Sequence, residues 1–321
     1  MRPGFSVIVF TVLSGAGYGL LAWLGLALGM GVYLVGINAL LVALSVGLFL
    51  SASGLIVSTM HLGKPWRGWR GLTQWRSSWL SREAIAALVT WIPLLGLVAL
   101  RHAPRDSLAV RGVGLALAAC ALLTVYCTAR IYTSLKPIPA WRLPQVLPGY
   151  LLMALASGGL WLWLVVNLQL QSRSPEVAEL ARNGWLFALL VLLLATAINK
   201  RRYWARLDAG VATPSTGRAT GLDRFGHVTA ASPPHTEANY LLREMGFVLA
   251  RRHRLKLRRA AMLLGFVLPI LWVGLALLVP PAGIWAAWLA MFSVMSGMIV
   301  ERWLFFAEAR HVIAAWYSTR R

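Results

Sequence analysis

Three ionisable residues that could bind and protonate a small carbonyl compound lie in one short segment, STMHLGKPWRGWRGLTQWRSSWLSREAI at 58–85. They are His61, Arg67 and Glu83. An imidazole that titrates near neutral pH and a carboxylate can exchange protons with a lipid-soluble carbonyl compound, and a quinone fits because its reduction takes up protons. We therefore predict quinone binding and proton transfer at these three residues, with Trp79 and Arg82 as secondary candidates.

Simpler interpretations exist for each residue alone. His61 follows an apolar stretch and could interact with the last carbonyl groups of a helix. Glu83 follows Ser81, a capping-type residue, and could be a carboxylate favoured by the positive end of a helix, or an ion-pair partner of Arg82 or Arg67. Ionisable residues at membrane depth are functional by default, but these lie near the membrane edge. Their joint occurrence in one connection therefore brings the functional interpretation level with the simpler ones, and both stay open at this point.

The segment connects two apolar stretches of a strongly apolar chain. Hydrophobic residues make up 59% of 321 positions and charged residues 13%, whereas soluble domains carry about 25% charged residues. A membrane core needs about 20 apolar residues per helix. Eight such stretches lie at 5–29, 32–59, 81–100, 109–133, 148–170, 180–198, 260–279 and 283–306. We predict an all-α fold, a polytopic bundle of eight transmembrane helices that forms a single membrane domain over 1–321.

The basic residues predict how this bundle is oriented. If both termini lie on one side, 26 of the 31 Lys and Arg residues fall on that side. Cytoplasmic loops carry the excess of such residues, so we predict that both termini and this face are cytoplasmic, in the inner membrane of a bacterium. The net charge of +21 then reflects topology rather than binding to nucleic acid. A basic face could also complement an acidic partner protein in either compartment.

The longest connection, at 199–259, is predicted to be a cytoplasmic loop between the sixth and seventh spans. Its middle is rich in Gly, Pro, Ser and Thr, and Thr236 could cap a helix that starts at Glu237. The middle has too few apolar residues to fold alone, so it is either a linker or a surface ordered by a partner. We favour partner docking, because long structured loops are often functional.

Other kinds of chemistry find little support in the sequence. The two cysteines, Cys120 and Cys127, form no CxxC motif, and two histidines on facing spans are lacking, so no haem and no metal site are predicted. No Ser-His-Asp or Cys-His arrangement points to a catalytic nucleophile. Glu301, Arg302 and Glu308 could join a proton route, but an ion-pair cluster within one helix is the simpler interpretation.

Four motifs resemble the membrane anchor subunit of dimethyl sulfoxide reductase-type molybdenum enzymes. They are HLGKPWR at 61–67, SSWLSREAI at 77–85, RIYTSLKPI at 130–138 and the N-terminal RPGFSVIVFTVLSGAGYGLL. The resemblance covers essentially the whole chain. It implies an anchor without haem that docks an iron-sulfur subunit, which connects to a molybdopterin catalytic subunit, and that exchanges electrons with menaquinone or ubiquinone. The family's quinol-site residues correspond to His61, Arg67 and Glu83.

Within this family, RSSWLSRE and the HTEANYLLREMGF run resemble the branch that serves cytoplasmic sulfite dehydrogenase, which oxidises sulfite and reduces quinone. The predicted cytoplasmic basic face agrees with that branch. The alternative within the family is a quinol-oxidising anchor of a dimethyl sulfoxide or related reductase. In either case the chain is a subunit that carries the quinone site, without a catalytic residue of its own. An anion transporter and a purely structural anchor are the alternatives from other classes.

Overall fold

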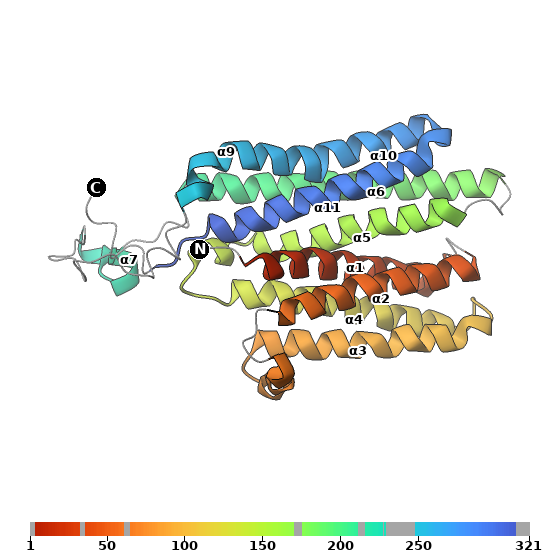
Figure 1. Cartoon of the computed structure of the whole chain (residues 1–321), viewed down its shortest axis with the longest axis horizontal. Coiled ribbons are helices and arrows are strands. Elements are labelled where there is room, and N and C mark those ends of the chain that lie inside the picture. The colour runs from red at the N-terminus through yellow and green to blue at the C-terminus, as the bar shows by residue number, and fades with distance from the viewer. Residues whose placement is uncertain are drawn as a thin grey trace.

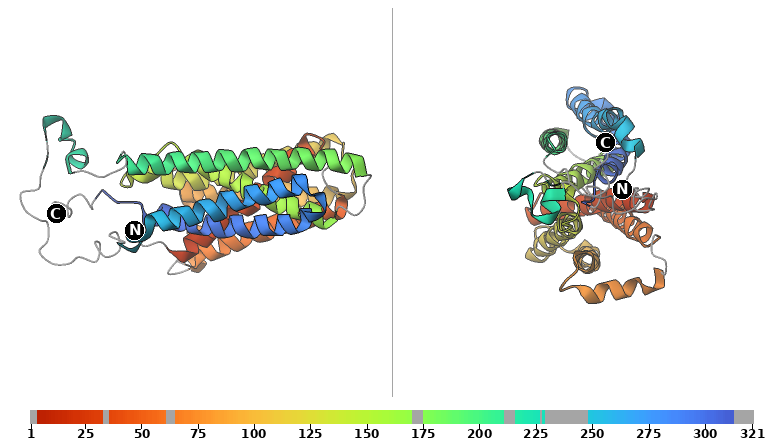
Figure 2. Two further views of the ribbon diagram at one scale, coloured as in Figure 1. Left: turned by 90° about the horizontal axis from the view of Figure 1, so that it is seen from above. Right: turned by 90° about the vertical axis from the view of Figure 1, so that its left-hand side faces the viewer.

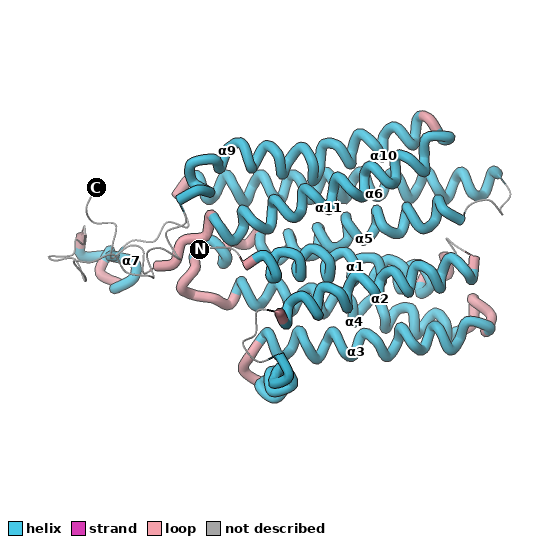
Figure 3. The backbone as a smooth tube through the Cα atoms, viewed as in Figure 1, coloured by secondary structure: helices cyan, strands magenta, loops and turns pink. Residues whose placement is uncertain are grey.

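The computed structural model shows long helices that lie side by side (Figure 1). It describes residues 4–32, 36–60, 65–169, 175–210, 216–226, 228 and 248–312, and in these ranges the backbone forms only helices and loops (Figure 3). The helices are α1 (Phe5–Gly29), α2 (Ile37–Thr59), α3 (Trp79–Ala99), α4 (Leu108–Thr133), α5 (Val146–Gln169), α6 (Pro175–Asp208), α7 (Thr216–Thr220), α9 (Val248–Met262), α10 (Leu268–Leu278) and α11 (Gly283–Ala307). Short 3₁₀ helices are Pro65–Gln74, Leu100–His102, Pro139–Arg142, Asp223–Phe225 and Pro280–Ala282, and Leu263–Val267 is a π-helical turn.

Eight of the described helical segments are long and apolar enough to cross a membrane, which confirms the predicted number of spans. The main difference concerns the sixth and seventh spans. Helix α6 continues to Asp208 and α9 begins at Val248, so helix occupies both ends of the predicted 199–259 loop. The hydropathy pattern placed the end of the sixth span at 198 because charged residues follow that position. A helix can nevertheless continue through charged residues as long as its backbone hydrogen bonds are made. The helix predicted to start at Glu237 lies outside the described residues.

Both described ends of the chain lie at the same end of the bundle, on the left in Figure 1. We call this the basic end, and it comprises 65–82, 130–146, 199–210, 248–259 and 301–312. An even number of spans requires this arrangement of the ends. The seventh span is α9, the π-helical turn and α10 in succession. Pro269 lacks the N–H that would bond the preceding turn, and the Ser293 hydroxyl on α11 donates instead to the carbonyl of Leu264 at 2.7 Å.

Helix α1 is the centre of the bundle and packs against α2, α4 and α5. Its glycines let the neighbours approach closely. Gly17 faces the backbone of α2, Gly25 that of α4, and Gly19 that of α5, where it lies against Ala154 and Gly158. A side chain at any of these three glycines would collide with backbone atoms. Gly15, one turn before Gly19 on the same helix, differs from these three, because no atom of a neighbour lies within 4 Å of where its Cβ would be.

The contrast between Gly19 and Gly15 gives a matched test of this packing. Gly19→Ala should lower the stability of the purified protein in detergent, by about 1–3 kcal/mol or more, because backbone cannot move aside as a side chain can. Gly15→Ala places the same methyl group on the same helix in open space and should leave the thermal unfolding midpoint near that of the wild type. Equal midpoints for the two variants would show that α5 does not approach α1 at Gly19.

Candidate functional site

The predicted site begins in the connection between α2 and α3. His61 lies outside the described residues, so its position and contacts stay a prediction. The 3₁₀ helix Pro65–Gln74 follows and runs across the bundle axis at the basic end (Figure 2). Arg67 is on this helix and is exposed. Trp69 and Trp75 are also exposed, which gives this connection a surface of aromatic and basic side chains.

Hydrogen bonds from the start of α3 tie this connection to the bundle. The α3 cap is Ser78, whose hydroxyl accepts from the N–H of Ser81 at 3.5 Å. The Ser81 hydroxyl donates to the carbonyl of Gly71. Arg82 donates to the carbonyls of Trp75 and Arg76 at 2.8 and 2.7 Å. The prediction that Ser81 is the cap is therefore wrong, because the helix starts three residues earlier and Ser81 holds the preceding connection instead.

Glu83 is the residue that the structure places in the most distinctive environment. It lies beyond the first turn of α3 and is only 3% exposed, so it is not the terminal carboxylate that the simpler interpretation described. The Thr128 hydroxyl on α4 donates to Oε1 of Glu83, whereas Arg82 binds backbone carbonyls. A carboxyl group is expensive to bury without partners, and here it is held by a hydroxyl rather than by a cation.

The Thr128 hydroxyl can serve either protonation state of Glu83. It also lies 3.1 Å from the carbonyl oxygen of Thr124. One hydroxyl has one proton and two lone pairs, so it can donate to a Glu83 carboxylate, or donate to Thr124 and accept from a protonated Glu83. This arrangement suits a carboxyl group that gains and loses a proton in place.

Trp79 lies between two cations at the start of α3. The guanidinium carbons of Arg82 and Arg130 are 4.3 and 4.9 Å from its ring centroid, and Tyr126 meets it edge to face at 6.0 Å. Cations attract the π face of an indole ring, so these contacts join α3 to the last turn of α4. The structure thus brings Trp79 and Arg82 together, one turn from Glu83, while Arg67 stays exposed on the 3₁₀ helix.

A cavity lined mostly by α1 and α5, with further residues from α4 and α11, lies behind Thr128. Its polar lining includes Thr11, Tyr18, Thr128, Tyr150, Ser157 and Arg302, and Gly15 also borders it. Thr128 therefore faces the cavity while it holds Glu83. Residues from α1 and α5 were not predicted as part of this site, whereas Arg302 on α11 was considered for a proton route. For α1, the polar residues at 11, 14 and 18 in an otherwise apolar span were the available signal.

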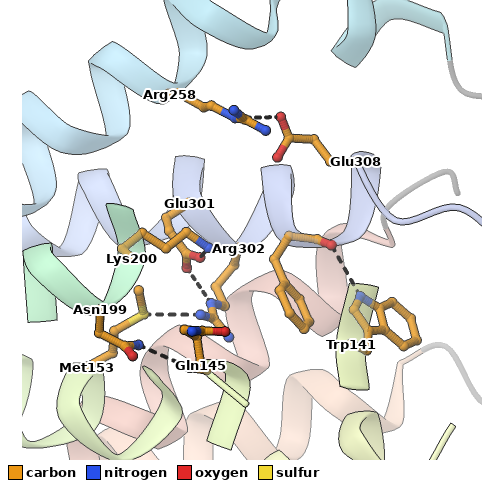
Figure 4. A network of polar contacts seen from close by, with 10 residues as sticks. Trp141, Gln145, Met153, Asn199, Lys200, Arg258, Glu301, Arg302 and Glu308 are labelled. Atoms are coloured by element: carbon orange, nitrogen blue, oxygen red, sulfur yellow. Dashed lines mark hydrogen bonds and ion pairs between the residues drawn. The ribbon is translucent and has the colours of Figure 1, made fainter. Parts of the chain in front are cut away.

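The structure also forms a buried ionic cluster that extends beyond the single helix expected from the sequence. Glu301 on α11 pairs with Lys200 on α6 and, at 2.5 Å, with Nε of the neighbouring Arg302 (Figure 4). All three residues are at most 5% exposed. The expected ion pair within one helix is present between Glu301 and Arg302, but the cluster is not confined to that helix, because Lys200 on α6 joins it. The signal was Lys200, a cation that follows an apolar stretch without a break in the helix.

A second group of ion pairs continues from this cluster toward the basic end. Arg258 on α9 donates to Glu308 at 2.8 Å and to Asp208 at 2.7 Å. Glu308 lies just beyond α11, and burial raises the pKa of its carboxyl group although Arg258 opposes this effect. Arg254 also lies 3.7 Å from the Asp208 carboxylate, and both of these side chains are about half exposed. The network therefore joins four cations to three carboxylates.

Comparison with known proteins agrees with the resemblance seen in the motifs. A family model described as "DMSO reductase anchor subunit (DmsC)" matches residues 1–307. A sulfite dehydrogenase subunit of Allochromatium vinosum is 31% identical over 343 aligned positions, which cover 99% of each chain. No solved structure matches the chain significantly.

The match to the family model spans almost all of the chain, including all eight membrane helices. The curated relative aligns from end to end at an identity that shows common descent. This integral membrane protein therefore belongs to the family of DMSO reductase anchor subunits.

Proposed function

We propose that this chain is the quinone-reactive anchor of a molybdopterin and iron-sulfur oxidoreductase, and that it passes electrons between the iron-sulfur subunit and membrane quinone. The observation that carries the proposal is the buried Glu83 carboxyl group, which the Thr128 hydroxyl holds next to the connection that contains His61. Family membership supports the anchor role. The name of the relative from Allochromatium vinosum favours sulfite as the substrate of the catalytic partner.

The residues at the start of α3 fit a quinone headgroup in chemical terms. An exchangeable menaquinone or ubiquinone accepts two electrons and two protons at its oxygens when it is reduced. Glu83 can hold and release a proton beside Thr128, and His61 is predicted to donate a hydrogen bond. Arg82 and Arg130 around Trp79 place positive charge nearby, which would favour electron arrival. Arg67 remains the candidate for stabilising negative charge on the reduced ring.

The basic end is the surface on which we expect the iron-sulfur subunit to dock. The 3₁₀ helix Pro65–Gln74 exposes Arg67 and Trp69 there, and aromatic and arginine side chains are enriched in protein interfaces. The same end carries the connections at 134–144 and after α6. Docking at this end brings the electron donor to the side of the membrane on which Glu83 lies. We place this end in the cytoplasm, as the charge distribution favours.

The main alternative within this proposal is electron flow in the opposite direction, from quinol to the iron-sulfur subunit. The family description names dimethyl sulfoxide reductase, and an anchor of such a reductase would oxidise quinol. The redox couple of the catalytic partner sets this direction.

Purification of the intact complex tests the anchor role. We expect an iron-sulfur protein and a molybdopterin protein to co-purify with the chain from mild detergent, and the complex to reduce decylubiquinone with sulfite. A transporter would purify without either partner. A purely structural anchor would bring both partners but no quinone reduction. Activity only from quinol to dimethyl sulfoxide would select the reductase alternative.

Substitution of Glu83 tests its role in proton exchange. Glu83→Gln keeps the shape and should lower sulfite-to-quinone turnover by about 10²–10⁴-fold, the usual contribution of a proton-transferring group. Sulfite oxidation with ferricyanide, which bypasses the quinone site, should be unchanged. His61→Ala should lose the same reaction without loss of assembly. Asp106→Asn, an exposed carboxyl group at the opposite end of the bundle, is the matched control, and wild-type quinone turnover in both site variants would contradict the assignment.

Labelling of single cysteines tests the orientation. After Cys120 and Cys127 are replaced, Arg224→Cys and Asp106→Cys each place one thiol at an exposed position. A membrane-impermeant maleimide should label Asp106→Cys in intact cells and Arg224→Cys only after lysis. The reverse pattern would put the basic end outside the cytoplasm.

A further inference from the structure

Three residues that line the cavity behind Thr128 carry a buried polar atom without a partner. The hydroxyls of Tyr18 and Tyr150 and Nη1 of Arg302 make no hydrogen bond within the described part of the chain. A buried donor without an acceptor is unfavourable, so three such groups around one space indicate that it holds hydrogen-bonding molecules. The wall of the cavity is mostly apolar, but these polar side chains reach it, and its volume of about 30 Å³ is enough for water.

A smaller cavity lies on the other side of Arg302, toward the basic end. It is lined by Gln145, Asn199, Lys200 and Tyr203, and it shares Tyr150, Met153 and Arg302 with the first cavity. Nη2 of Arg302 contacts Sδ of Met153 at 3.1 Å (Figure 4). These side chains form the partition between the two spaces. Both are long, unbranched side chains with several rotatable bonds, which are suited to move aside.

These spaces and side chains are arranged in order from the surface to Glu83. Gln145 and Asn199, joined by a hydrogen bond of 3.0 Å from Asn199 to the Gln145 backbone carbonyl, lie where α5 begins at the basic end. The Lys200, Glu301 and Arg302 cluster comes next, followed by the larger cavity and then Thr128. Thr128 donates to Glu83. Every step in this order is a group that can donate or accept a hydrogen bond, or a space that can hold water.

We propose that the two cavities form one hydrated proton route, which links the aqueous phase at the basic end to Glu83 through the Lys200, Glu301 and Arg302 cluster. Glu83 is 3% exposed, so a proton needs an internal carrier to reach it. Cationic side chains alone would repel protons, but the carboxylates of Glu301, Glu308 and Asp208 offset three of the four cations in this network, and the fourth, Arg254, is half exposed.

This inference rests on the proposed function, which supplies the reaction that uses the protons. Reduction of one quinone takes two electrons from the iron-sulfur subunit and two protons, and an O–H bond forms at each quinone oxygen. The route delivers protons from water at the basic end. When electrons flow from quinol, the same groups carry two protons outward.

A leucine at position 15 would fill the larger cavity. Gly15 borders that cavity and has open space where its side chain would be. In the purified complex, Gly15→Leu should lower sulfite-to-quinone turnover by about tenfold or more, with a larger solvent isotope effect in D₂O. Its affinity for decylubiquinone and its sulfite-to-ferricyanide activity should stay unchanged. The control is Gly112→Leu, which adds the same side chain at an exposed glycine of α4 with equally open surroundings.

If the complex with Gly15→Leu does not assemble, Tyr18→Phe provides a second test of the proton route. It removes a hydroxyl that has no partner within the described residues, so a merely structural role predicts unchanged or higher stability and unchanged turnover. The route predicts slower quinone turnover and an increased isotope effect at unchanged quinone affinity.

The outcomes separate the two proposals. A wild-type complex that neither binds nor reduces quinone overturns the proposed function and the route with it. An active wild type, together with a folded Gly15→Leu or Tyr18→Phe complex whose turnover and isotope effect equal those of Gly112→Leu, overturns the route alone.

Discussion

The cost of placing charge in hydrocarbon governs this structure. A membrane interior offers no water to solvate a lysine or a carboxylate, so each charge inside the bundle must find a partner there. Lys200 and Glu301 meet this requirement across two helices, and Arg302 joins them. Because an unpaired buried charge is strongly destabilising, this cluster fixes how α6 and α11 face each other. The cavities described above exist on either side of it.

Helix α1 meets a second constraint, which is the close packing of several helices around one span. Lipid tails are as apolar as leucine, so helices in a membrane associate by close contact rather than by hydrophobic burial. Glycines on different faces of α1 allow α2, α4 and α5 to approach its backbone. Where the spacing places a glycine away from any neighbour, at Gly15, the contact opens into the cavity. Packing and a hydrated interior therefore arise from the same small residues.

The proposed site combines these two features. Glu83 and Thr128 lie where α3 meets α4, close to the connection that exposes basic and aromatic side chains at the basic end. An electron donor docked on that surface and a proton carrier inside the bundle would approach a quinone from different directions. This separation is physically sensible, because electrons arrive from a protein partner whereas protons must come from water.

The all-helical class, the eight spans and the family could be predicted from the sequence alone, because they depend on apolar length and on local motifs. Glu83 and Trp79 could be selected in the same way, since a carboxylate near the start of a span is conspicuous. The sequence could not show that Glu83 is held by Thr128, 45 residues away, or that Lys200 pairs with Glu301. Contacts between distant segments depend on which faces of the helices meet. The folded bundle was needed to see them, because close packing of side chains, rather than hydropathy, sets the rotation of each helix.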